Sequence, residues 1–578
     1  MEKLSLLYPP EKLQTEQNLP EATFHDLSVE SICEQLTDTE TERALLMRTM
    51  KCISGDEEVV RYRSDIFEDI LHFPQMRADL QKLLDRVDFL RTYGSFAKDL
   101  DEAGVWELVH RLDEMDEYIR CVQSIYECLS ANEVRSEGLL QLKDYTASLY
   151  TDSGFAELQK DIDALKVDAS KVKSVTLGVN LNERYEPVET GIVSINEKPF
   201  TKSNIVSNFC EFLDRGDNVS KDAEWNENYS MRTSGYKPGE VSSNMEQVDV
   251  TPYAIQNPFL AAGLASVGSE PRSEDAIRVL DRSISALLTR TVKKLKSTLS
   301  KHVSVSTYMI TALIPELLFY IRWAEYIEKM QKKGFRFSKP EVLPVGERLM
   351  RSRGIYNLKL AQALYEQGEG PEKLVPNDLD FDAEHRIYIL TGANRGGKTT
   401  ITQAVGLAFL LAQCGIYVPA ESFAFSPADN IFTHYPADEN QTLDLGRLGE
   451  EASRFRKIFD ELTPQSLLLL NESFSTTSFE EGYYIARDVT RILRRLGVRT
   501  IYNTHIHRLA SELDELNRED EGDSRISSLI VVTKDSERSF RVMVAPPPGK
   551  SYAQDITEKY GVSYEQLEQA INKKDTTS

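Results

Sequence analysis

The sequence predicts a mixed fold, in which a helical first half carries a small β-containing insertion and is followed by an α/β domain. Residues 27–135 are rich in Leu, Ile, Glu and Arg and contain almost no Pro or Gly. Residues 136–215 contain short runs of β-branched residues, which favour strands. From about residue 350 onward, short apolar strands alternate with helices, which is typical of an α/β domain.

The helical part is predicted from apolar residues that recur at three- and four-residue spacing. Ser28 to Met50 and Glu57 to Arg91 have this spacing, which indicates packed amphipathic helices. Helices resume from Ser273 to about Lys332 and include a basic stretch with Arg290, Lys293, Lys294, Lys296 and Lys301. This stretch fits a solvated helix face and a local contact with DNA equally well.

The insertion is predicted to contain a β-hairpin. Val175 to Asn182 and Gly191 to Asn196 hold β-branched residues bounded by Asn and Gly. Residues 216–270 are rich in Ser, Asn, Gly and Glu and are interpreted as a long polar excursion. The expected domains are therefore 1–135, 136–270, 271–345 and 346–578.

Composition limits the classes of function. The 578 residues include 41% hydrophobic and 28% charged residues, as in ordinary globular proteins. The net charge of −24 argues against a surface that binds nucleic acid everywhere, so contact with DNA would need a local basic patch. The six cysteines form no CxxC pair, the N-terminus does not resemble a signal peptide, and charges interrupt the apolar stretch Met309 to Ile327. A cytoplasmic protein is expected.

Residues 392–399 match the phosphate-binding pattern GxxxxGK[ST] at every fixed position. A strand-like run, Arg386 to Thr391, precedes them, and an apolar helix, Thr399 to Leu411, follows. Backbone amides of such a loop surround phosphate oxygens, the lysine reaches the β- and γ-phosphates, and the hydroxyl ligates Mg²⁺. We therefore expect ATP and Mg²⁺ to bind here, at Gly392, Ala393, Asn394, Arg395, Gly396, Gly397, Lys398, Thr399 and Thr400. Arg395 is unusual in this loop and is a candidate contact to phosphate or to a partner subunit.

Two further strands are predicted to end beside the loop. The run Leu467 to Leu470 leads into Asn471 and Glu472, and Val498 to Tyr502 leads toward His505. At these ends, a carboxylate can orient the attacking water and a histidine can sense the γ-phosphate. Thr399 with Asn471 is the candidate metal site, and Lys398, Glu472 and His505 are the candidate catalytic residues. Because Asn471 carries no charge, slow turnover is expected.

Taken together, these residues resemble the ATPase domain of the MutS family of DNA mismatch-repair proteins, a branch of the ABC ATPases. The resemblance runs from about Leu374 to Leu567. It includes Val375-Pro-Asn-Asp378, the loop itself, Cys414-Gly-Ile-Tyr-Val-Pro-Ala420, Ile431-Phe-Thr433, Asn471-Glu472, Ser475-Thr-Thr-Ser478, Thr504-His505 and Gly549-Lys-Ser-Tyr552. Several independent matches in the same order are more specific than the loop alone.

The resemblance implies a homodimer in which each ATP site borrows a signature segment from the partner subunit. The counterpart here is Leu445 to Glu451, with Gly446, Arg447 and Gly449; a simple helix start with favourable acidic residues explains the glutamates equally well. The resemblance also implies a helical core and lever domain, including Tyr62 to Ile66, a clamp-like insertion, and DNA as partner.

This sequence departs from the family pattern. Asn471 replaces the usual aspartate, Gly446 lies where a signature serine is usual, and Leu374 lies where an aromatic residue stacks on adenine. The N-terminal mismatch-reading domain and an appended nuclease are expected to be missing, and Phe155-Ala-Glu157 is interpreted as a packing segment. Mismatch recognition is therefore the family property with least support in this sequence.

Three functions remain open. The first is a dimeric ATPase that couples nucleotide state to a helical arm that engages DNA in repair or recombination. The second is a nucleotide-gated binding module with little hydrolysis, which Asn471 would explain. The third, the ATPase subunit of a membrane transporter, is weakened by the long helical first half and by the motifs near the C-terminus.

Overall fold

The computed structural model describes most of the chain. The described residues are 4–12, 17–93, 105–169, 174–181, 183, 187–196, 289–302, 312–392, 396–436, 446–519, 522, 524–534, 537–547 and 563–568. Contacts within the chain define two compact units. Unit 1 comprises residues 1–77, 134–141 and 315–578, and unit 2 comprises residues 78–133 and 142–314. The limits expected from the sequence, at residues 135, 270 and 345, differ from these and stay a prediction.

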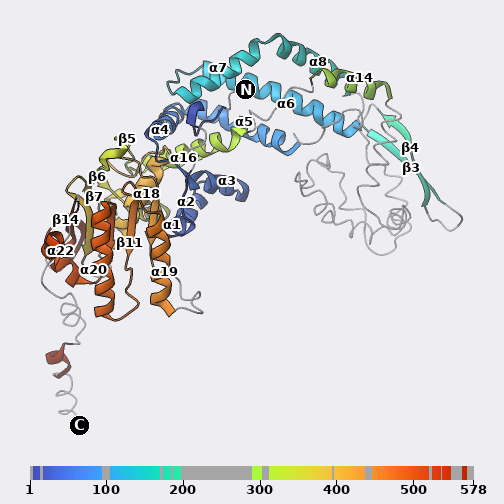
Figure 1. Ribbon diagram of the computed structural model, residues 1–578. Coiled ribbons are helices and arrows are strands. Elements are labelled where there is room, and N and C mark those ends of the chain that lie inside the picture. Colours follow the sequence, from blue (N-terminus) through green and yellow to red (C-terminus); the bar gives the residue numbers. More distant parts are fainter. Residues whose placement is uncertain are drawn as a thin grey trace. The chain divides into compact units, whose positions relative to one another are not determined.

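Unit 2 is mainly helical (Figure 1). Its helices are α6 (Val105–Ser130), α8 (Ser153–Ala169), α14 (Thr289–Leu299), the 3-10 turn η2 (Ser300–His302) and most of α5 (Pro74–Tyr93) and α7 (Glu137–Thr151). α6, α8 and α14 pack on one another through buried leucines such as Leu112, Leu158 and Leu295. The predicted hairpin is confirmed as β3 (Ser174–Leu181) and β4 (Pro187–Asn196), which pair antiparallel.

Several expectations for this region lie outside the described residues. They include the polar excursion at 216–270 and the helical segments at 273–288 and 303–311. Phe155 is buried in α8, in agreement with its interpretation as a packing residue. In α14, Lys293 and Lys294 are exposed, and Lys301 just beyond it lies 3.4 Å from Asp161.

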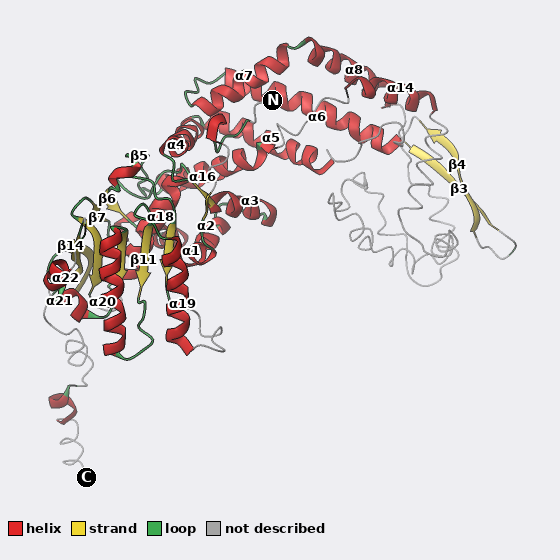
Figure 2. Ribbon diagram, in the orientation of Figure 1, coloured by secondary structure: helices red, strands yellow, loops and turns green. Residues whose placement is uncertain are grey.

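Unit 1 begins with short helices that pack against a larger α/β part (Figure 2). These elements are η1 (Pro10–Lys12), β1 (Gln17–Asn18), α1 (Glu21–Asp26), α2 (Val29–Glu34), α3 (Glu40–Lys51), β2 (Cys52–Ile53), α4 (Glu57–His72), the start of α5 (Pro74–Tyr93) and α16 (Ile314–Lys332). Thr23 of α1 donates a hydrogen bond to the carbonyl of Ile431, 2.9 Å away. Arg63 of α4 is fully buried and donates to the carbonyl oxygens of Leu7 and Gln413. These helices therefore belong to the same core as the sheet.

The main sheet has the strand order β10-β11-β12-β8-β13-β14. Its strands are β8 (His385–Thr391), β10 (Ile431–His434), β11 (Leu467–Asn471), β12 (Arg499–Asn503), β13 (Arg525–Lys534) and β14 (Glu537–Val544). All neighbouring pairs are parallel except β13 with β14. β11 is wholly buried, as a parallel strand covered on both faces must be. The three strands expected from the sequence are confirmed as β8, β11 and β12.

A second sheet, which the sequence did not predict, has the order β5-β9-β6-β7. It contains β5 (Pro340–Val342), β6 (Met350–Ile355), β7 (Asn377–Phe381) and β9 (Ser422–Phe425), with η3 (Val345–Glu347), α17 (Leu358–Glu366) and η4 (Pro371–Lys373) between them. Helices α18 (Lys398–Gln413), α19 (Gly446–Glu461), α20 (Phe479–Leu496), α21 (His507–Ser511) and α22 (Leu513–Glu519) complete the unit.

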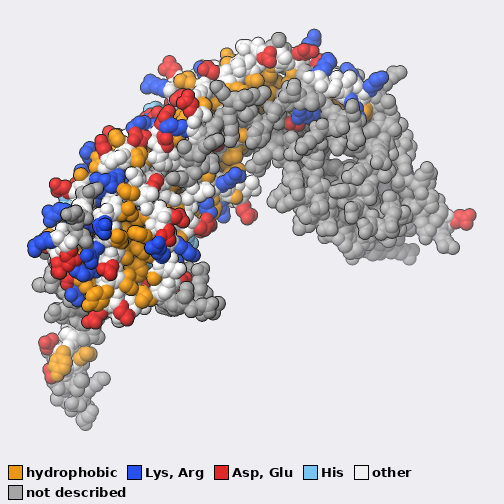
Figure 3. All heavy atoms as spheres, viewed as in Figure 1, with side chains coloured by type: hydrophobic (Ala, Val, Ile, Leu, Met, Phe, Trp, Pro, Cys, Tyr) orange, Lys and Arg blue, Asp and Glu red, His pale blue; other side chains and the backbone are white. Residues whose placement is uncertain are grey.

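Helix α20 illustrates how the local sequence sets the element limits. Ser478 caps its first turn by accepting a hydrogen bond from the backbone N–H of Glu481, and Gly497 ends it at a φ of 70°. Its exposed large hydrophobic side chains are Phe479, Tyr484 and Ile492, and hydrophobic side chains gather over this helix on the viewed face (Figure 3). No helix among the described residues is long and apolar enough to cross a membrane.

Candidate nucleotide site

The glycine loop leads directly from β8 into α18. Gly392 follows the strand, and Gly397, at a φ of 90°, precedes the first helical residue, Lys398. A side chain at Gly397 would be strained at this φ, so the sequence needs glycine here. The first turn of α18 presents its unpaired N–H groups toward the loop, which favours an anion. Ala393, Asn394 and Arg395 lie outside the described residues.

Lys398 is buried at the mouth of this loop. Its side chain is 5% exposed, and its Nζ donates to the carbonyl of Gly392, 3.0 Å away. Burial lowers the pKa of Lys398, and the nearby Glu472 carboxylate opposes this change. A buried ammonium group at a helix N-terminus is repelled by the helix dipole, so a phosphate group would satisfy both positive charges.

Thr399 and the end of β11 meet beside the lysine. The Thr399 hydroxyl donates to Asn471 Oδ1 at 3.0 Å. This hydrogen bond turns the hydroxyl proton toward Asn471, which leaves a Thr399 oxygen lone pair for a cation. Asn503, which ends the neighbouring strand β12, also donates to Asn471 Oδ1. Asn503 was not predicted from the sequence as a site residue, although it lies only two residues before the predicted His505.

Glu472 and His505 lie side by side just beyond the ends of β11 and β12. His505 Nε2 lies 2.7 Å from Glu472 Oε1, and both side chains are more than one-third exposed. Glu472 has a φ of 54°, and its backbone N–H donates to the carbonyl of Asn503 at 2.8 Å. The hydrogen bond from His505 lowers the pKa of Glu472, so the carboxylate stays ionised. A strained, ionised carboxylate at a strand end suits a group that orients water.

These side chains surround one cavity of about 660 Å³. Gly396, Gly397, Lys398, Thr399, Thr400, Glu472 and His505 line its polar part. Its apolar part is lined by Ile355, Leu360, Leu374, Val375, Ile401, Ala404 and Phe540. This volume suits a nucleotide, with phosphates at the polar end and a base against the apolar wall.

Asn357, Asn377 and Phe540 also line the cavity and were not predicted as site residues. Asn357 caps α17 by accepting from the N–H of Leu360 and donates to the carbonyl of Thr400, each at 3.0 Å. Asn377 joins β7 to β14, because it donates to the carbonyl of Phe540 at 3.3 Å and accepts from the N–H of Val542 at 2.7 Å. These asparagines hold the cavity wall in place. The only sequence signal was the family-like run from Val375 to Asp378, which contains Asn377 but not Asn357.

Gly446 opens helix α19, as the sequence predicted, and Gly449 in its first turn is not among the described residues that line the cavity. The same helix is linked to the residues that follow β11 through the buried His434. His434 Nε2 lies 3.0 Å from the carbonyl of Glu451, and Nδ1 lies 2.7 Å from Ser473 Oγ. Since a carbonyl only accepts, Nε2 carries the proton, and the single Ser473 hydroxyl proton lies between Nδ1 and the backbone carbonyl of His434, which is 2.8 Å from the serine oxygen. Burial lowers the pKa of His434 to about 4, so it is neutral.

The parallel sheet, the glycine loop at the start of α18 and the polar strand ends define a P-loop nucleotide-binding domain. The comparisons with known proteins agree with this class. A family model of MutS domain V, an ABC-type ATPase domain, matches residues 388–576. A second, of the MutS2 N-terminal domain, matches residues 55–333. The chain belongs to the MutS family.

Curated relatives are similar over the ATPase domain. The DNA mismatch repair protein MutS of Chlorobium chlorochromatii is 32% identical over 200 residues, which are 34% of this chain and 22% of that protein. The MutS protein of Chlorobaculum tepidum is 34% identical over the same shares of each chain. That of Prochlorococcus marinus (strain MIT 9301) is 29% identical over 235 residues, or 40% of this chain and 25% of that protein. The match spans about a quarter or less of these relatives.

Proposed function

We propose that the protein binds and hydrolyses ATP with Mg²⁺ at this cavity and, as a homodimer, couples its nucleotide state to engagement of DNA. The observation that carries the proposal is the 2.7 Å contact between Glu472 and His505, on the same cavity wall as Lys398 and Thr399. A phosphate loop alone supports binding. A carboxylate held by a histidine beside that loop supports hydrolysis as well.

Phosphate binding is assigned to the first turn of α18. The backbone N–H groups from Gly396 to Thr400 and the ammonium group of Lys398 hold the β- and γ-phosphates. On binding, Lys398 exchanges its hydrogen bond to the carbonyl of Gly392 for a phosphate oxygen. Ala393, Asn394 and Arg395 are assigned to the same loop from the sequence pattern.

The donor set beside Lys398 fits a hard divalent cation, because it offers a hydroxyl oxygen and amide oxygens. Thr399 would ligate the ion directly, and Asn471 holds the threonine hydroxyl in the orientation that this requires. When bound, Mg²⁺ neutralises charge on the β- and γ-phosphate oxygens.

Hydrolysis is assigned to Glu472. Its carboxylate accepts a hydrogen bond from the attacking water and directs the oxygen lone pair at the γ-phosphorus. His505 holds this carboxylate before the nucleotide arrives and then turns its ring N–H toward the γ-phosphate. The proton of the attacking water passes to phosphate or to Glu472 as the bond to the β-phosphate oxygen breaks.

Dimerisation is assigned to the surface near α19 and α20. Gly446, Arg447 and Gly449 at the start of α19 are proposed to complete the ATP site of the partner subunit. The exposed hydrophobic side chains of α20, Phe479 and Tyr484, support a self-association surface because large exposed hydrophobic patches are uncommon on monomers. A Tyr484→Lys variant should lower the dimer fraction measured by light scattering, and an unchanged fraction would exclude this surface.

DNA engagement is assigned to the helices and the hairpin that precede the ATPase domain. Residues 1–135, 271–345 and 136–270 are proposed to form, respectively, the helical core, the returning lever helices and the clamp-like insertion. The exposed Lys293 and Lys294 of α14, with Arg290, Lys296 and Lys301, are the candidate phosphate contacts. On a protein with a net charge of −24, such contacts predict binding that weakens steeply with salt.

A second function is favoured by one specific observation: the strand ends beside Thr399 carry two neutral amides, Asn471 and Asn503. Without a carboxylate there, the cation is held less firmly and turnover falls. The protein would then be a nucleotide-gated binding module that does not recognise mismatches. Steady-state hydrolysis well above that of a Lys398→Ala variant would rule out this second function.

The proposed engagement of DNA is tested by measuring ATP turnover with duplex, mismatched and four-way DNA at low salt, together with the binding of each DNA form to the protein. We expect at least one of these to bind and to change the rate of phosphate release. A Lys293→Glu and Lys294→Glu double variant should weaken binding to every DNA form about equally, because phosphate contacts carry no sequence information. A protein that binds none of the three forms at low salt would contradict the DNA assignment.

A further inference from the structure

Asn503, at the end of β12, is the most completely buried polar side chain of the site. It is 0% exposed, and its Cα pairs with that of Asn471 across the two parallel strands. Its Nδ2 donates to Asn471 Oδ1 and also lies 3.4 Å from Thr399 Oγ1. The amide group is therefore fixed in orientation, with its nitrogen toward Asn471 and Thr399.

Asn471 has no acceptor capacity left on its side-chain oxygen. That oxygen accepts from the Thr399 hydroxyl at 3.0 Å and from Asn503 Nδ2. A carbonyl oxygen has two lone pairs, so both are used. Asn471 therefore organises Thr399, and its Oδ1 cannot at the same time accept a hydrogen bond from a water molecule of a bound cation.

Asn503 Oδ1, in contrast to Asn471 Oδ1, still has its capacity to accept hydrogen bonds. It is buried and has no hydrogen-bond partner among the residues that the structure describes. Exchanging oxygen and nitrogen in Asn503 alone would bring two acceptors together at Asn471, so Asn503 can turn only if Asn471 turns with it. Native proteins rarely leave a buried acceptor without a partner, and one that lies beside a nucleotide site points to a ligand.

We propose that Asn503 Oδ1 is the acceptor for a water molecule of the divalent cation that accompanies the nucleotide, in addition to the Thr399 and Asn471 site expected from the sequence. This inference rests on the proposed binding of ATP with Mg²⁺ at Lys398 and Thr399. Water molecules of Mg²⁺ and Mn²⁺ donate to such oxygens, and partners of this kind orient the ion without touching it. Because the Asn471–Asn503 pair is neutral, it positions the cation and adds no charge to hold it.

The test measures Mn²⁺ affinity by electron paramagnetic resonance with the non-hydrolysable analogue AMPPNP bound to the full chain. Asn503→Ala removes the acceptor and should weaken Mn²⁺ roughly tenfold, as the loss of an outer partner of a metal typically does. Asn503→Asp keeps an oxygen and adds a charge but loses the donor to Asn471, so the Asn471 amide must turn and donate to the new carboxylate. With that turn, the added charge should tighten Mn²⁺ binding by a similar factor. In both variants, the affinity for AMPPNP in EDTA should stay close to that of the wild type.

Thr500→Val is the matched control. Thr500 is buried on the same strand, and its hydroxyl donates to the carbonyl of Val498 at 3.3 Å. Valine has the same shape as threonine and removes only this hydroxyl. This variant should leave Mn²⁺ affinity unchanged, and an equal loss there would mean that Asn503 acts only through the fold. If Mn²⁺ affinity is the same in the wild type and both Asn503 variants, the role of Asn503 is overturned and the proposed binding of ATP is not affected. Failure of the wild type to bind AMPPNP with or without Mn²⁺ would overturn the proposed function as well.

Discussion

Glu472 Oε1 accepts a hydrogen bond from His505 Nε2 at 2.7 Å, and this contact joins the ends of two neighbouring strands, β11 and β12. The histidine keeps the carboxylate ionised and fixes one of its oxygens. The other oxygen remains available to a water molecule. Under the proposed function, this pair joins the group assigned to activate water with the group assigned to respond to the γ-phosphate.

The pH dependence of hydrolysis should report this contact. Because His505 lowers the pKa of Glu472, the carboxylate of the wild type stays ionised below the usual range of glutamate, and activity should fall only at lower pH. His505→Ala should raise that pKa toward its ordinary value and move the acid limb of kcat/KM to higher pH. His507→Ala, two residues farther on, is the control and should leave the acid limb in place. An acid limb that is identical in all three proteins would contradict the role of this pair.

Restoring a carboxylate at residue 471 should strengthen the cation site. In Asn471→Asp, the Thr399 hydroxyl and Asn503 Nδ2 can both still donate to residue 471, and the new charge attracts the ion. The Mg²⁺ concentration that gives half-maximal hydrolysis should fall about tenfold, a typical effect of a residue around a metal. Asn430→Asp, which adds the same charge before β10, should have no such effect. Equal Mg²⁺ dependence in Asn471→Asp and the wild type would show that the missing charge does not limit the site.

The buried His434 should make the protein less stable in acid. Its pKa is about 4 when folded and near 6.5 when exposed, so between these values the unfolded chain binds a proton that the folded chain does not. Stability therefore falls as the pH decreases through this window, by on the order of 3 kcal/mol in total. His434→Gln can keep both hydrogen bonds without titrating, so its free energy of unfolding should fall less between pH 7 and pH 5. Denaturant titrations of both proteins at the two pH values provide the measurement, and equal losses would refute this assignment.

Arg499 should be essential for stability. Its guanidinium group is fully buried, donates to the carbonyls of Ser426 and Gln465 at 2.6 Å each, and lies 5.0 Å from the centre of the Phe409 ring. Arg499→Leu would leave these buried acceptors unpaired, at a cost of roughly 3 kcal/mol or more. The exposed Arg456→Leu should change the free energy of unfolding by less than about 0.5 kcal/mol. A tolerated Arg499→Leu would mean that water or a repacked neighbour can replace the guanidinium group.

The sequence predicted the nucleotide loop, helix α18 and the three central strands because each has a local pattern. GxxxxGK[ST] fixes the loop, apolar runs mark β8, β11 and β12, and the hairpin β3–β4 is bounded by Asn and Gly. The last motif of the resemblance, Gly549 to Tyr552, lies outside the described residues.

The missed residues depend on contacts that no local pattern reveals. Asn503 matters because the register of β11 and β12 pairs it with Asn471, and sequence alone does not give a register. Phe540 reaches the cavity because β14 adds antiparallel to β13 at the sheet edge. Likewise, the helices of the first 77 residues share a core with residues 315–578, which a division of the sequence by composition could not anticipate.

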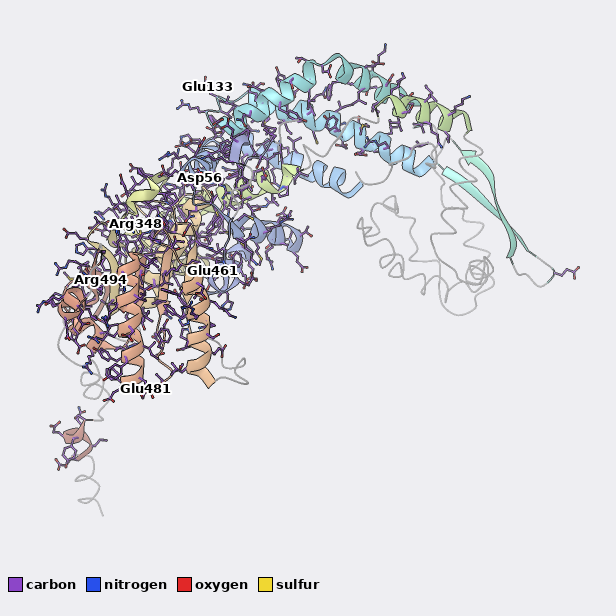
Figure 4. All side chains as sticks on the ribbon, viewed as in Figure 1. Asp56, Glu133, Arg348, Glu461, Glu481 and Arg494 are labelled. Carbon is purple, nitrogen blue, oxygen red and sulfur yellow. The ribbon has the colours of Figure 1, made fainter. Side chains whose placement is uncertain are left out.

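ATP hydrolysis at this cavity is tested most directly by measuring phosphate release by the wild type, Glu472→Ala and Lys398→Ala, with ATP binding measured in parallel. Glu461→Gln is the control for the loss of an acidic side chain, because Glu461, at the end of α19 (Figure 4), is not among the described residues that line the cavity. We predict that the wild type releases phosphate well above Lys398→Ala. Glu472→Ala should still bind ATP but lose activity by about a hundredfold or more, as expected for a group that activates water. Hydrolysis by Glu472→Ala at the wild-type rate would contradict the assignment of water activation to Glu472.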